Sequence, residues 1–430
     1  MKYYLAIDLG ATSGRHIVGY QKDNEFVLDV IHTFPTGMKE SSDGLVWDIP
    51  HLFDEIKLGI KKAFDKYENL VSLSIDTWGV DYVLMNNDKE IPPFYAYRNE
   101  RNVKSSEDLH KIIPFHDLYF KTGIQYQAYN TIYQLFDDLN KGRLDKATDY
   151  LMLPSYFSYK LTGKKTHEYT DESTGALIDP ITHQYAYDVL DKVGLPRRLF
   201  TELKEPGFII GDLLPEIQKE VGGNTKVILC ASHDTASAFE VVEEKDGIIL
   251  SSGTWSLIGI KSPVAICNEE SLKANFTNEG GIHYIRFLKN IMGMWLVNQL
   301  QAQDNIDFMS IIPHLIDNTY VETFNVNDAS LVAPKNMKKA ILKLLKNNPP
   351  KNDEDLLNSV YHSLAKAYQE ACDSIERITN TQYFKIYVVG GGAKNLYLNS
   401  LIERYTNKQV ISVCDEATSL GNIKLQMKTL

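Results

Sequence analysis

The apolar residues at the start of the chain form two short runs separated by a polar segment. Residues 3–7 and 17–20 are largely apolar, and the segment from Asp8 to Arg15 between them contains Gly, Ser and Thr. Two such runs around a turn of small residues are typical of neighbouring strands. We therefore predict a strand, a polar turn and a second strand at the N-terminus.

The spacing of apolar residues changes to that of a helix over residues 51–67. The positions that recur at intervals of three or four are Leu52, Phe53, Ile56, Ile60 and Phe64. Residues 70–75 are again a short apolar run, which predicts a strand that ends at Asp76. Strands and helices that mix in this way predict an α/β fold.

The strand–turn–strand pattern occurs a second time, about half the chain later. Residues 247–250 and 257–260 are apolar, and the segment from Ser251 to Ser256 between them is rich in Ser, Thr and Gly. Two such hairpins suggest an internal duplication of one domain design. We predict a domain boundary near residue 240, which divides the chain into residues 1–240 and 241–430.

The last quarter of the chain predicts a long helix and then a buried strand. Apolar residues from Leu357 to Ile378 keep helical spacing, and Asn352 and Asp353 are candidate capping residues at the start. The apolar run 384–389 leads into three glycines, Gly390 to Gly392, and a helix is expected from Leu396. The glycines allow a backbone to approach a flat ligand closely.

Composition and charge narrow the classes of ligand. The chain has 430 residues, 43% hydrophobic and 23% charged, with a formal net charge of −11. An acidic protein does not present the clustered Lys and Arg that nucleic acid requires. No apolar run approaches the ~18 residues of a spanning helix, and Asp8 interrupts the first run too early for a secretory signal. We expect a soluble, cytoplasmic protein with a small-molecule substrate and no nucleic-acid or membrane partner, either a monomer or a homodimer.

The first polar turn has the chemistry of a phosphate site. Small residues expose backbone N–H groups, Thr12 and Ser13 add hydroxyl donors, and Arg15 can neutralise an anionic oxygen. Asp8 could hold Mg²⁺ through water. The alternative is an ordinary polar hairpin turn, but the similar turn at Ser251 to Ser256 favours phosphate binding.

Asp234 is the candidate general base. It follows the apolar run 227–230 in the segment Ser232-His233-Asp234-Thr235. Phosphoryl transfer needs an oriented hydroxyl and a base near the attacking oxygen, and a carboxylate meets that need. The alternative interpretation is a helix N-cap, a position that Asp also favours.

A candidate sugar site combines aromatic and polar side chains, and the glycine turn allows a rival interpretation. Trp78, Asp81, Tyr97 and Arg98 could hold a sugar between ring faces and polar groups, although Trp78 could equally be a core residue. The strand, glycine turn and helix at residues 384–396 also come close to a dinucleotide fingerprint. That match is incomplete, because Asn395 stands where the third glycine would be.

Several of these stretches together resemble one family, the FGGY carbohydrate kinases. The resemblance runs in order through nearly the whole chain. The stretches that carry it are residues 6–15, 75–81, 97–98, 130–135, 154–163, 231–238, 251–257, 278–281, 289–293, 389–392 and 419–422. Within the family, the forms at 78–81 and 232–235 resemble the members that act on L-rhamnulose more than those for xylulose or glycerol.

The resemblance implies two actin-like, ribonuclease-H-type domains of the ASKHA superfamily around a central cleft. It implies that the domain over residues 1–240 binds the sugar and carries the catalytic base, and that the domain over residues 241–430 binds the nucleotide. It implies that Asp234 takes the proton from the 1-hydroxyl of the sugar and that Mg²⁺ accompanies ATP. The implied sugar contacts are Trp78, Gly79, Asp81, His233, Asp234, Thr235 and Asn290. The implied ATP contacts are Ala11, Thr12, Ser13, Gly14, Arg15, Thr254, Asn298 and Gly391.

The sequence departs from the family pattern at three places. Asn298 stands where relatives can carry a nucleotide-contacting Gln, and Asn99 stands where the family often has Asp. The chain ends at Leu430, where relatives continue, so we expect a naturally short or a shortened form. Two alternatives stay open: a kinase for another ketose such as L-fuculose or xylulose, and a non-catalytic nucleotide-binding regulator.

Overall fold

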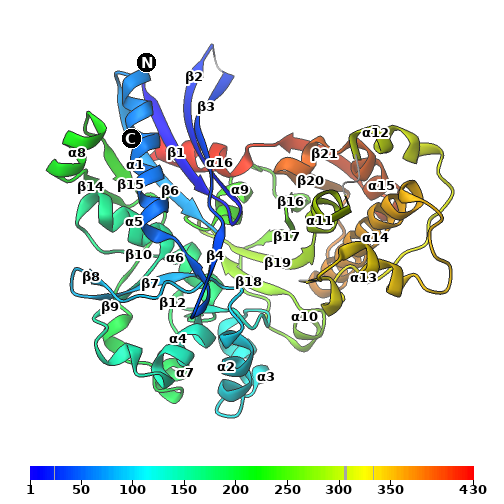
Figure 1. Ribbon diagram of the computed structural model, residues 1–430, viewed down its shortest axis with the longest axis horizontal. Coiled ribbons are helices and arrows are strands. Elements are labelled where there is room, and N and C mark those ends of the chain that lie inside the picture. The colour runs from blue at the N-terminus through cyan, green and yellow to red at the C-terminus, as the bar shows by residue number, and fades with distance from the viewer. Residues whose placement is uncertain (24, 305–307, 333) are drawn as a thin grey trace. The chain divides into compact units, whose positions relative to one another are not determined.

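The chain folds into two compact units (Figure 1). The computed structural model describes residues 1–23, 25–304, 308–332 and 334–430. Unit 1 contains Met1–Val241, Lys261–Phe287 and Thr418–Leu430, and unit 2 contains Val242–Ile260 and Leu288–Ala417. After the boundary that we predict at residue 240, the chain thus returns to unit 1 twice. The assignment of the sugar to the first domain and the nucleotide to the second stays a prediction.

The main sheet of unit 1 has six strands, with β1 and β6 side by side near its centre (Figure 1). β2 pairs antiparallel with β1, and β6 pairs parallel with it. In sheet order the strands are β14 (Ile209–Asp212), β15 (Lys226–Ile228), β6 (Leu70–Thr77), β1 (Tyr3–Leu9), β2 (Ser13–Lys22) and β3 (Glu25–Pro35).

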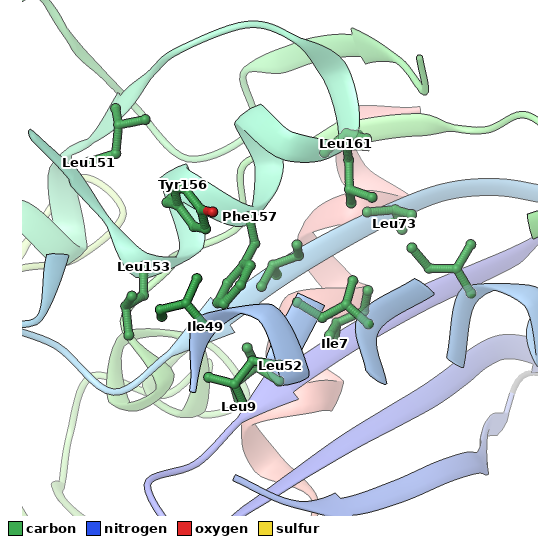
Figure 2. Packing of buried hydrophobic residues seen from close by; sticks show 14 of the residues in the cluster. Ile7, Leu9, Ile49, Leu52, Leu73, Leu151, Leu153, Tyr156, Phe157 and Leu161 are labelled. Atoms are coloured by element: carbon green, nitrogen blue, oxygen red, sulfur yellow. The ribbon is translucent and has the colours of Figure 1, made fainter. Parts of the chain in front are cut away.

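Helices cover both faces of this sheet, which explains why β1 is apolar along most of its length. Alternate side chains of a strand point to opposite faces. Ile7 and Leu9 pack with residues of α1 (Ile49–Lys66) and α5 (Leu153–Thr162), as Figure 2 shows. Tyr4 and Ala6 pack instead against Ile423 of the C-terminal helix α16 (Ala417–Thr429). The last helix of the chain therefore completes the core of unit 1.

The rest of unit 1 consists of short helices and small sheets. The helices are α2 (Arg101–His110), α3 (Phe115–Thr122), α4 (Thr131–Asn140), α6 (Tyr169–Glu172), α7 (Tyr187–Lys192), α8 (Pro215–Val221), α9 (Asp234–Phe239) and α10 (Glu269–Lys273). The strands of the small sheets are β4 (Met38–Ser41), β5 (Gly44–Trp47), β7 (Tyr82–Asn86), β8 (Lys89–Glu90), β9 (Asp149–Met152), β10 (His167–Glu168), β11 (Ile178–Asp179), β12 (Gln184–Tyr185) and β13 (Leu203–Lys204). β18 (Thr277–Gly280) instead belongs to the second six-stranded sheet.

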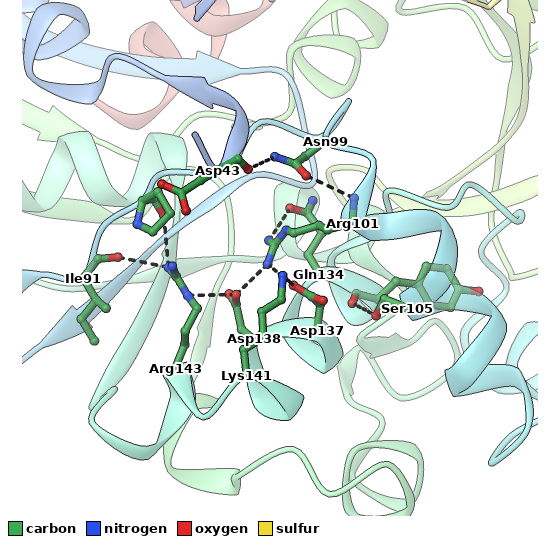
Figure 3. A network of polar contacts seen from close by, with 12 residues as sticks. Asp43, Ile91, Asn99, Arg101, Ser105, Gln134, Asp137, Asp138, Lys141 and Arg143 are labelled. Carbon is green, nitrogen blue, oxygen red and sulfur yellow. Dashed lines mark hydrogen bonds and ion pairs between the residues drawn. The ribbon is translucent and has the colours of Figure 1, made fainter. Parts of the chain in front are cut away.

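A buried ionic network ties α2 to α4 (Figure 3). Arg101 pairs with Asp137 at 2.9 Å and with Asp138 at 2.6 Å. The departure at Asn99 has a structural consequence here: its side-chain Nδ2 donates to the backbone oxygens of Asp43 and Leu45. Asn99 therefore holds the β4–β5 hairpin through neutral hydrogen bonds rather than through an ion pair.

Unit 2 repeats the central pattern of the first sheet. β16 (Ile248–Ser252) and β17 (Trp255–Ser262) form an antiparallel hairpin, and β20 (Lys385–Val389) runs parallel beside β16. The strand order continues with β19 (Ile285–Met292) beside β17 and β21 (Gln409–Cys414) beside β20. The helices are α11 (Trp295–Asp304), α12 (Phe308–Ile311), α13 (Met337–Leu344), α14 (Asp353–Thr379) and α15 (Leu396–Thr406).

The predicted elements form, with some shifted boundaries. Both hairpins and the long helix are confirmed, and the Asn352 side chain caps α14 by accepting from the N–H of Asp355. The first polar turn is shorter than predicted, because β1 extends through Asp8 and β2 begins at Ser13. Among the described residues, no helix has the length and apolar character needed to cross a membrane.

Acidification is expected to destabilise the fold through His16. This side chain is fully buried under α1, and burial, followed by the nearby His32, lowers its pKa from 6.5 to about 3. Below pH 6.5, His16 binds a proton in the unfolded chain but not in the folded chain. The free energy of unfolding therefore falls as the pH drops. We expect His16 to account for a loss of about 2 kcal/mol in unfolding free energy between pH 6.5 and 5. Urea unfolding of wild type and His16→Gln checks this, and equal pH slopes for the two would contradict it.

Candidate active site

Two carboxylates and a guanidinium lie together where β1, β2 and β6 run side by side. Asp8 faces Arg15 across the β1–β2 pair and Asp76 across the β1–β6 pair. Arg15 Nη2 lies 3.3 Å from Asp8 Oδ2. Burial and the charge of Asp8 raise the pKa of Asp76 well above its ordinary value. The site thus gathers negative charge that a cation can neutralise.

The two carboxylate oxygens of Asp76 differ in their hydrogen bonding. Its Oδ2 accepts from Asn422 Nδ2 of α16 at 2.5 Å. Within the part of the chain that the structure describes, its buried Oδ1 has no hydrogen-bond partner. Carboxylate oxygens are the ligands that Mg²⁺ prefers, and Mg²⁺ usually keeps several waters. The pair Asp8 and Asp76 therefore fits a water-bound divalent cation, although no group of three or more His, Cys, Asp or Glu among the described residues could hold a metal by itself.

The predicted phosphate contacts lie on the turn between β1 and β2 and at the start of β2. The turn is closed by the N–H of Gly10, which donates to Ser13 O at 3.0 Å. Thr12 and Ser13 are exposed, Ala11 and Arg15 are half-buried, and Gly14 packs tightly against Phe34. The exposed hydroxyls leave this turn open to a ligand on its outer side.

Asp234 is the first residue of α9, and its N-cap is His233. The alternative interpretation of Asp234 as an N-cap is therefore wrong, because the cap lies one position earlier. Asp234 Oδ1 accepts from the N–H and hydroxyl of Thr235, and 32% of the side chain is exposed. Burial raises the pKa of Asp234 above its ordinary value of 3.8, although the Thr235 bonds oppose the shift. A partly exposed carboxylate with a raised pKa suits a general base.

Asp234 has a histidine beside it, and that histidine has a buried arginine behind it. His233 Nε2 lies 3.4 Å from Asp234 Oδ1. His233 Nδ1 accepts from Arg286 Nη1 at 3.0 Å, and the same Nη1 lies 3.1 Å from Glu279 Oε2. Arg286 is fully buried on β19. Burial, followed by the Arg286 charge, lowers the pKa of His233 well below 6.5, so this imidazole is neutral.

Glu168 fixes the segment that leads to Asp234. Its Oε2 accepts from Thr170 Oγ1, from Asp171 N and from Ser232 N, the last at 3.2 Å. Burial raises the pKa of Glu168 to about 7. Because Ser232 precedes His233 directly, Glu168 holds the start of α9 in place from a segment far away in sequence.

The side chains of Trp78 and Asp81 are buried and bonded to each other. Asp81 Oδ2 accepts from Trp47 Nε1 at 2.6 Å and from Trp78 Nε1 at 3.0 Å, and it also accepts from the N–H of Tyr97. Its Oδ1 accepts from Gln134 Nε2 at 3.2 Å. Four protein donors thus reach the Asp81 carboxylate, three of them on Oδ2. The sugar contact of Asp81 stays a prediction, and its hydrogen bonds indicate a role in holding the two indoles.

Between Trp78 and Asp81 the backbone is strained. Val80 has a φ of +71°, which is rare for a β-branched residue. Its carbonyl accepts from Thr131 Oγ1 at 2.9 Å and from Gln134 Nε2 at 3.1 Å. Gly79 lies against Thr174, whose Oγ1 would be 2.8 Å from a Cβ. The surrounding bonds thus hold Gly79 in one position.

Replacement of Asp81 by asparagine is expected to destabilise the protein more than it weakens sugar binding. Either orientation of the amide turns an NH₂ group toward protein donors, and each unsatisfied donor costs about 1–3 kcal/mol. We expect a loss of about 2 kcal/mol in urea unfolding, with a ketose KM within about threefold of wild type in the folded fraction. A large rise in KM at unchanged stability would instead make Asp81 a direct sugar ligand.

Unit 2 carries the remaining predicted residues. Thr254 lies in the β16–β17 turn, and its carbonyl accepts a hydrogen bond from the N–H of Trp295. Gly391 is exposed and has open space where a Cβ would be. Asn298 is exposed on α11. Asn290 lies on β19, and its buried Oδ1 has no hydrogen-bond partner among the described residues. An unsatisfied amide oxygen of this kind can accept from a sugar hydroxyl.

Comparison with protein families identifies the fold. The N-terminal domain of the FGGY family of carbohydrate kinases matches residues 3–239, and the C-terminal domain of that family matches residues 248–430. The chain belongs to the FGGY family of carbohydrate kinases. Membership confirms the predicted two-domain, actin-like fold of this kinase, and it implies ATP as the phosphoryl donor and a small-molecule sugar as the acceptor.

The kinase is similar over its whole length to rhamnulokinases from several bacteria. That of Oceanobacillus iheyensis is 39% identical over 436 residues, which cover 99% of this chain and 93% of the relative. That of Halalkalibacterium halodurans is 40% identical over 441 residues, with 100% and 94% covered. That of Bacillus subtilis is 35% identical over 435 residues, with 99% and 90% covered.

Solved structures share the fold at low sequence identity. A ligand-bound xylulose kinase from Lactobacillus acidophilus has a TM-score of 0.83 at 16% identity, with 100% of this chain and 89% of the other covered. A glycerol kinase of Plasmodium falciparum with ADP has a TM-score of 0.79 at 15% identity, with 100% and 90% covered. The rival interpretation of Gly390 to Gly392 as a dinucleotide fingerprint has no support from these relatives.

Proposed function

We propose that this kinase transfers the γ-phosphoryl group of ATP to the 1-hydroxyl of L-rhamnulose. The observation that carries the proposal is the full-length similarity to rhamnulokinases. It is supported by the partly exposed carboxylate of Asp234, held at the start of α9 by Glu168 and flanked by a neutral His233. The products are L-rhamnulose 1-phosphate and ADP.

Asp234 acts on the attacking hydroxyl. As the O1–phosphorus bond forms and the bond to the β-phosphate oxygen breaks, the proton of the 1-hydroxyl passes to the Asp234 carboxylate. The raised pKa of Asp234 improves it as a proton acceptor. The proposed sugar contacts are Trp78, Gly79, His233, Thr235 and Asn290, with Asp81 behind the tryptophan.

Each hairpin turn, taken by itself, carries residues for which a nucleotide contact is proposed. The proposed contacts are Ala11 to Arg15 on the first turn, and Thr254, Asn298 and Gly391 in unit 2. Mg²⁺ would supply positive charge to the phosphate oxygens, and Asp8 with Asp76 would hold it through water. Arg15 adds a second positive charge on the same turn.

The direct test is a coupled ADP-release assay with Mg·ATP and four ketoses. The panel is L-rhamnulose, L-fuculose, L-ribulose and D-xylulose. We expect the highest kcat/KM for L-rhamnulose. Faster turnover of another ketose would show that L-rhamnulose is not the preferred substrate. If the protein still binds ATP but phosphorylates none of the four ketoses, a non-catalytic regulator would be favoured.

A further inference from the structure

The hydrogen bonds around His233 decide which of its ring nitrogens carries the proton. An arginine side chain only donates hydrogen bonds. Arg286 Nη1 lies 3.0 Å from His233 Nδ1, so this nitrogen must accept and the proton of the neutral ring is on Nε2. Glu279 Oε2 could compete as an acceptor for an Nδ1 proton, but it lies farther from Nδ1, at 3.5 Å, than Arg286 Nη1 does, and it forms an ion pair with Nη1 at 3.1 Å.

Arg286 is held so that it cannot turn away from the ring. Its Nε donates to Gly280 O at 2.7 Å, and its side chain has no exposed surface. The hydrogen bond from Arg286 Nε to Gly280 O and the ion pair with Glu279 hold the guanidinium against β18. Among the described residues, the charged side chains given within 3.5 Å of the His233 ring nitrogens are Arg286 and Glu279 at Nδ1 and Asp234 at Nε2.

We propose that Arg286 is a positioning residue that fixes the tautomer of His233, so that His233 Nε2–H is a permanent hydrogen-bond donor beside the reacting carboxylate. His233 then neither removes nor supplies a proton during turnover. Its Nε2 lies 3.4 Å from Asp234 Oδ1, and the Nε2–H can donate to an oxygen of the sugar when one is bound. This inference rests on the proposed function only in giving Asp234 the role of base.

The fixed tautomer has a chemical consequence for the reaction. If His233 were free to bind a proton, it would gain a positive charge next to Asp234 at mildly acidic pH and weaken that carboxylate as a base. Because Arg286 repels a second proton on the ring, Asp234 remains the single titrating group of the pair. Arg286 does this without touching the substrate.

The test is NMR of the kinase with ¹⁵N-labelled histidine between pH 5 and 8.5. The 11 histidines are resolved by comparison with His233→Gln. We expect the wild-type His233 signals to stay constant, with the proton on Nε2. A proton on Nδ1, or titration of His233 within this range, would overturn the proposal even if L-rhamnulose is a good substrate. Poor activity on every ketose with an unchanging Nε2–H would overturn only the proposed function.

Two arginine variants add a kinetic test. In Arg286→Met, His233 loses its hydrogen-bond donor and faces Glu279 without the arginine charge. His233 should then titrate near pH 6.5 or above, and the pH profile of kcat/KM should show a second ionisation. We expect the ketose KM to rise about tenfold or more, by analogy with lost partners of other oriented histidines. Arg286→Lys keeps a cationic donor and should restore the single ionisation. A methionine variant that is less stable but keeps the wild-type pH profile would show a purely structural role. If it does not fold, the wild-type spectrum alone decides.

Discussion

Asp234→Asn is expected to lower kcat by about a thousandfold or more, while ATP binds as tightly as to wild type. The amide cannot accept the hydroxyl proton, and general-base catalysis contributes about 10²–10⁴ in rate. Asparagine keeps the shape of the side chain and its bonds to Thr235, so the fold should survive. The measurements are kcat in the ADP-release assay and ATP affinity by calorimetry.

The dependence of wild-type kcat/KM on pH tests the same role of Asp234 as a base. Since burial raises the pKa of Asp234 above 3.8, kcat/KM should fall as pH drops through that raised value, with one acid limb. Asp117→Asn, at an exposed position where 60% of the side chain is accessible, is the control and should keep full activity. A kcat for Asp234→Asn within tenfold of wild type would remove Asp234 from the role of base.

Gly421→Ala should damage both stability and activity, although residue 421 lies far along the chain from Asp234. A Cβ at Gly421 would lie 1.9 Å from the backbone oxygen of Ser237 and 3.3 Å from Glu240 Cβ. Ser237 belongs to α9, the helix that begins with Asp234. Because the clash is with backbone, either α16 or α9 must move.

The expected cost is about 3 kcal/mol of unfolding free energy, at the upper end for overpacking by one methyl group. A displacement of α9 by about 1 Å can also cost up to about 10² in kcat. Gly222→Ala is the matched control: nothing lies within 4 Å of its Cβ position, so only its φ of +85° should matter, at about 1 kcal/mol with normal kcat. Equal behaviour of the two variants in urea unfolding and kcat would show that the α9–α16 contact tolerates the methyl group.

Local patterns in the sequence predict the elements well, because each depends on nearby residues. The hairpins at 3–20 and 248–262 and the long helix α14 follow from apolar spacing and turn residues alone. The pattern does not show where an element packs. α16 lies in the half of the sequence that we assign to the second domain, yet it completes the core of unit 1.

Sequence reasoning finds those residues of the candidate site that lie in short motifs. Asp234 and His233 lie in one such motif, but Glu168 and Arg286 reach them from segments 64 and 53 residues away, counted from Ser232 and His233. One signal for Arg286 was present in the sequence: a single charge inside the apolar run Tyr284-Ile285-Arg286-Phe287-Leu288. A buried charge needs a partner, so such an interruption marks a functional or structural pair.

The position of α16 also sets the order in which unit 1 can be completed during synthesis. The face of β1 and β2 that carries Tyr4, Ala6 and Ile17 stays uncovered until Ile423 is synthesised, which happens after both segments of unit 2. At 5–20 residues per second, translation of residues 242–430 takes roughly 10–40 s. During that interval the nascent chain exposes an apolar sheet face, which makes it a substrate for chaperones that bind such surfaces.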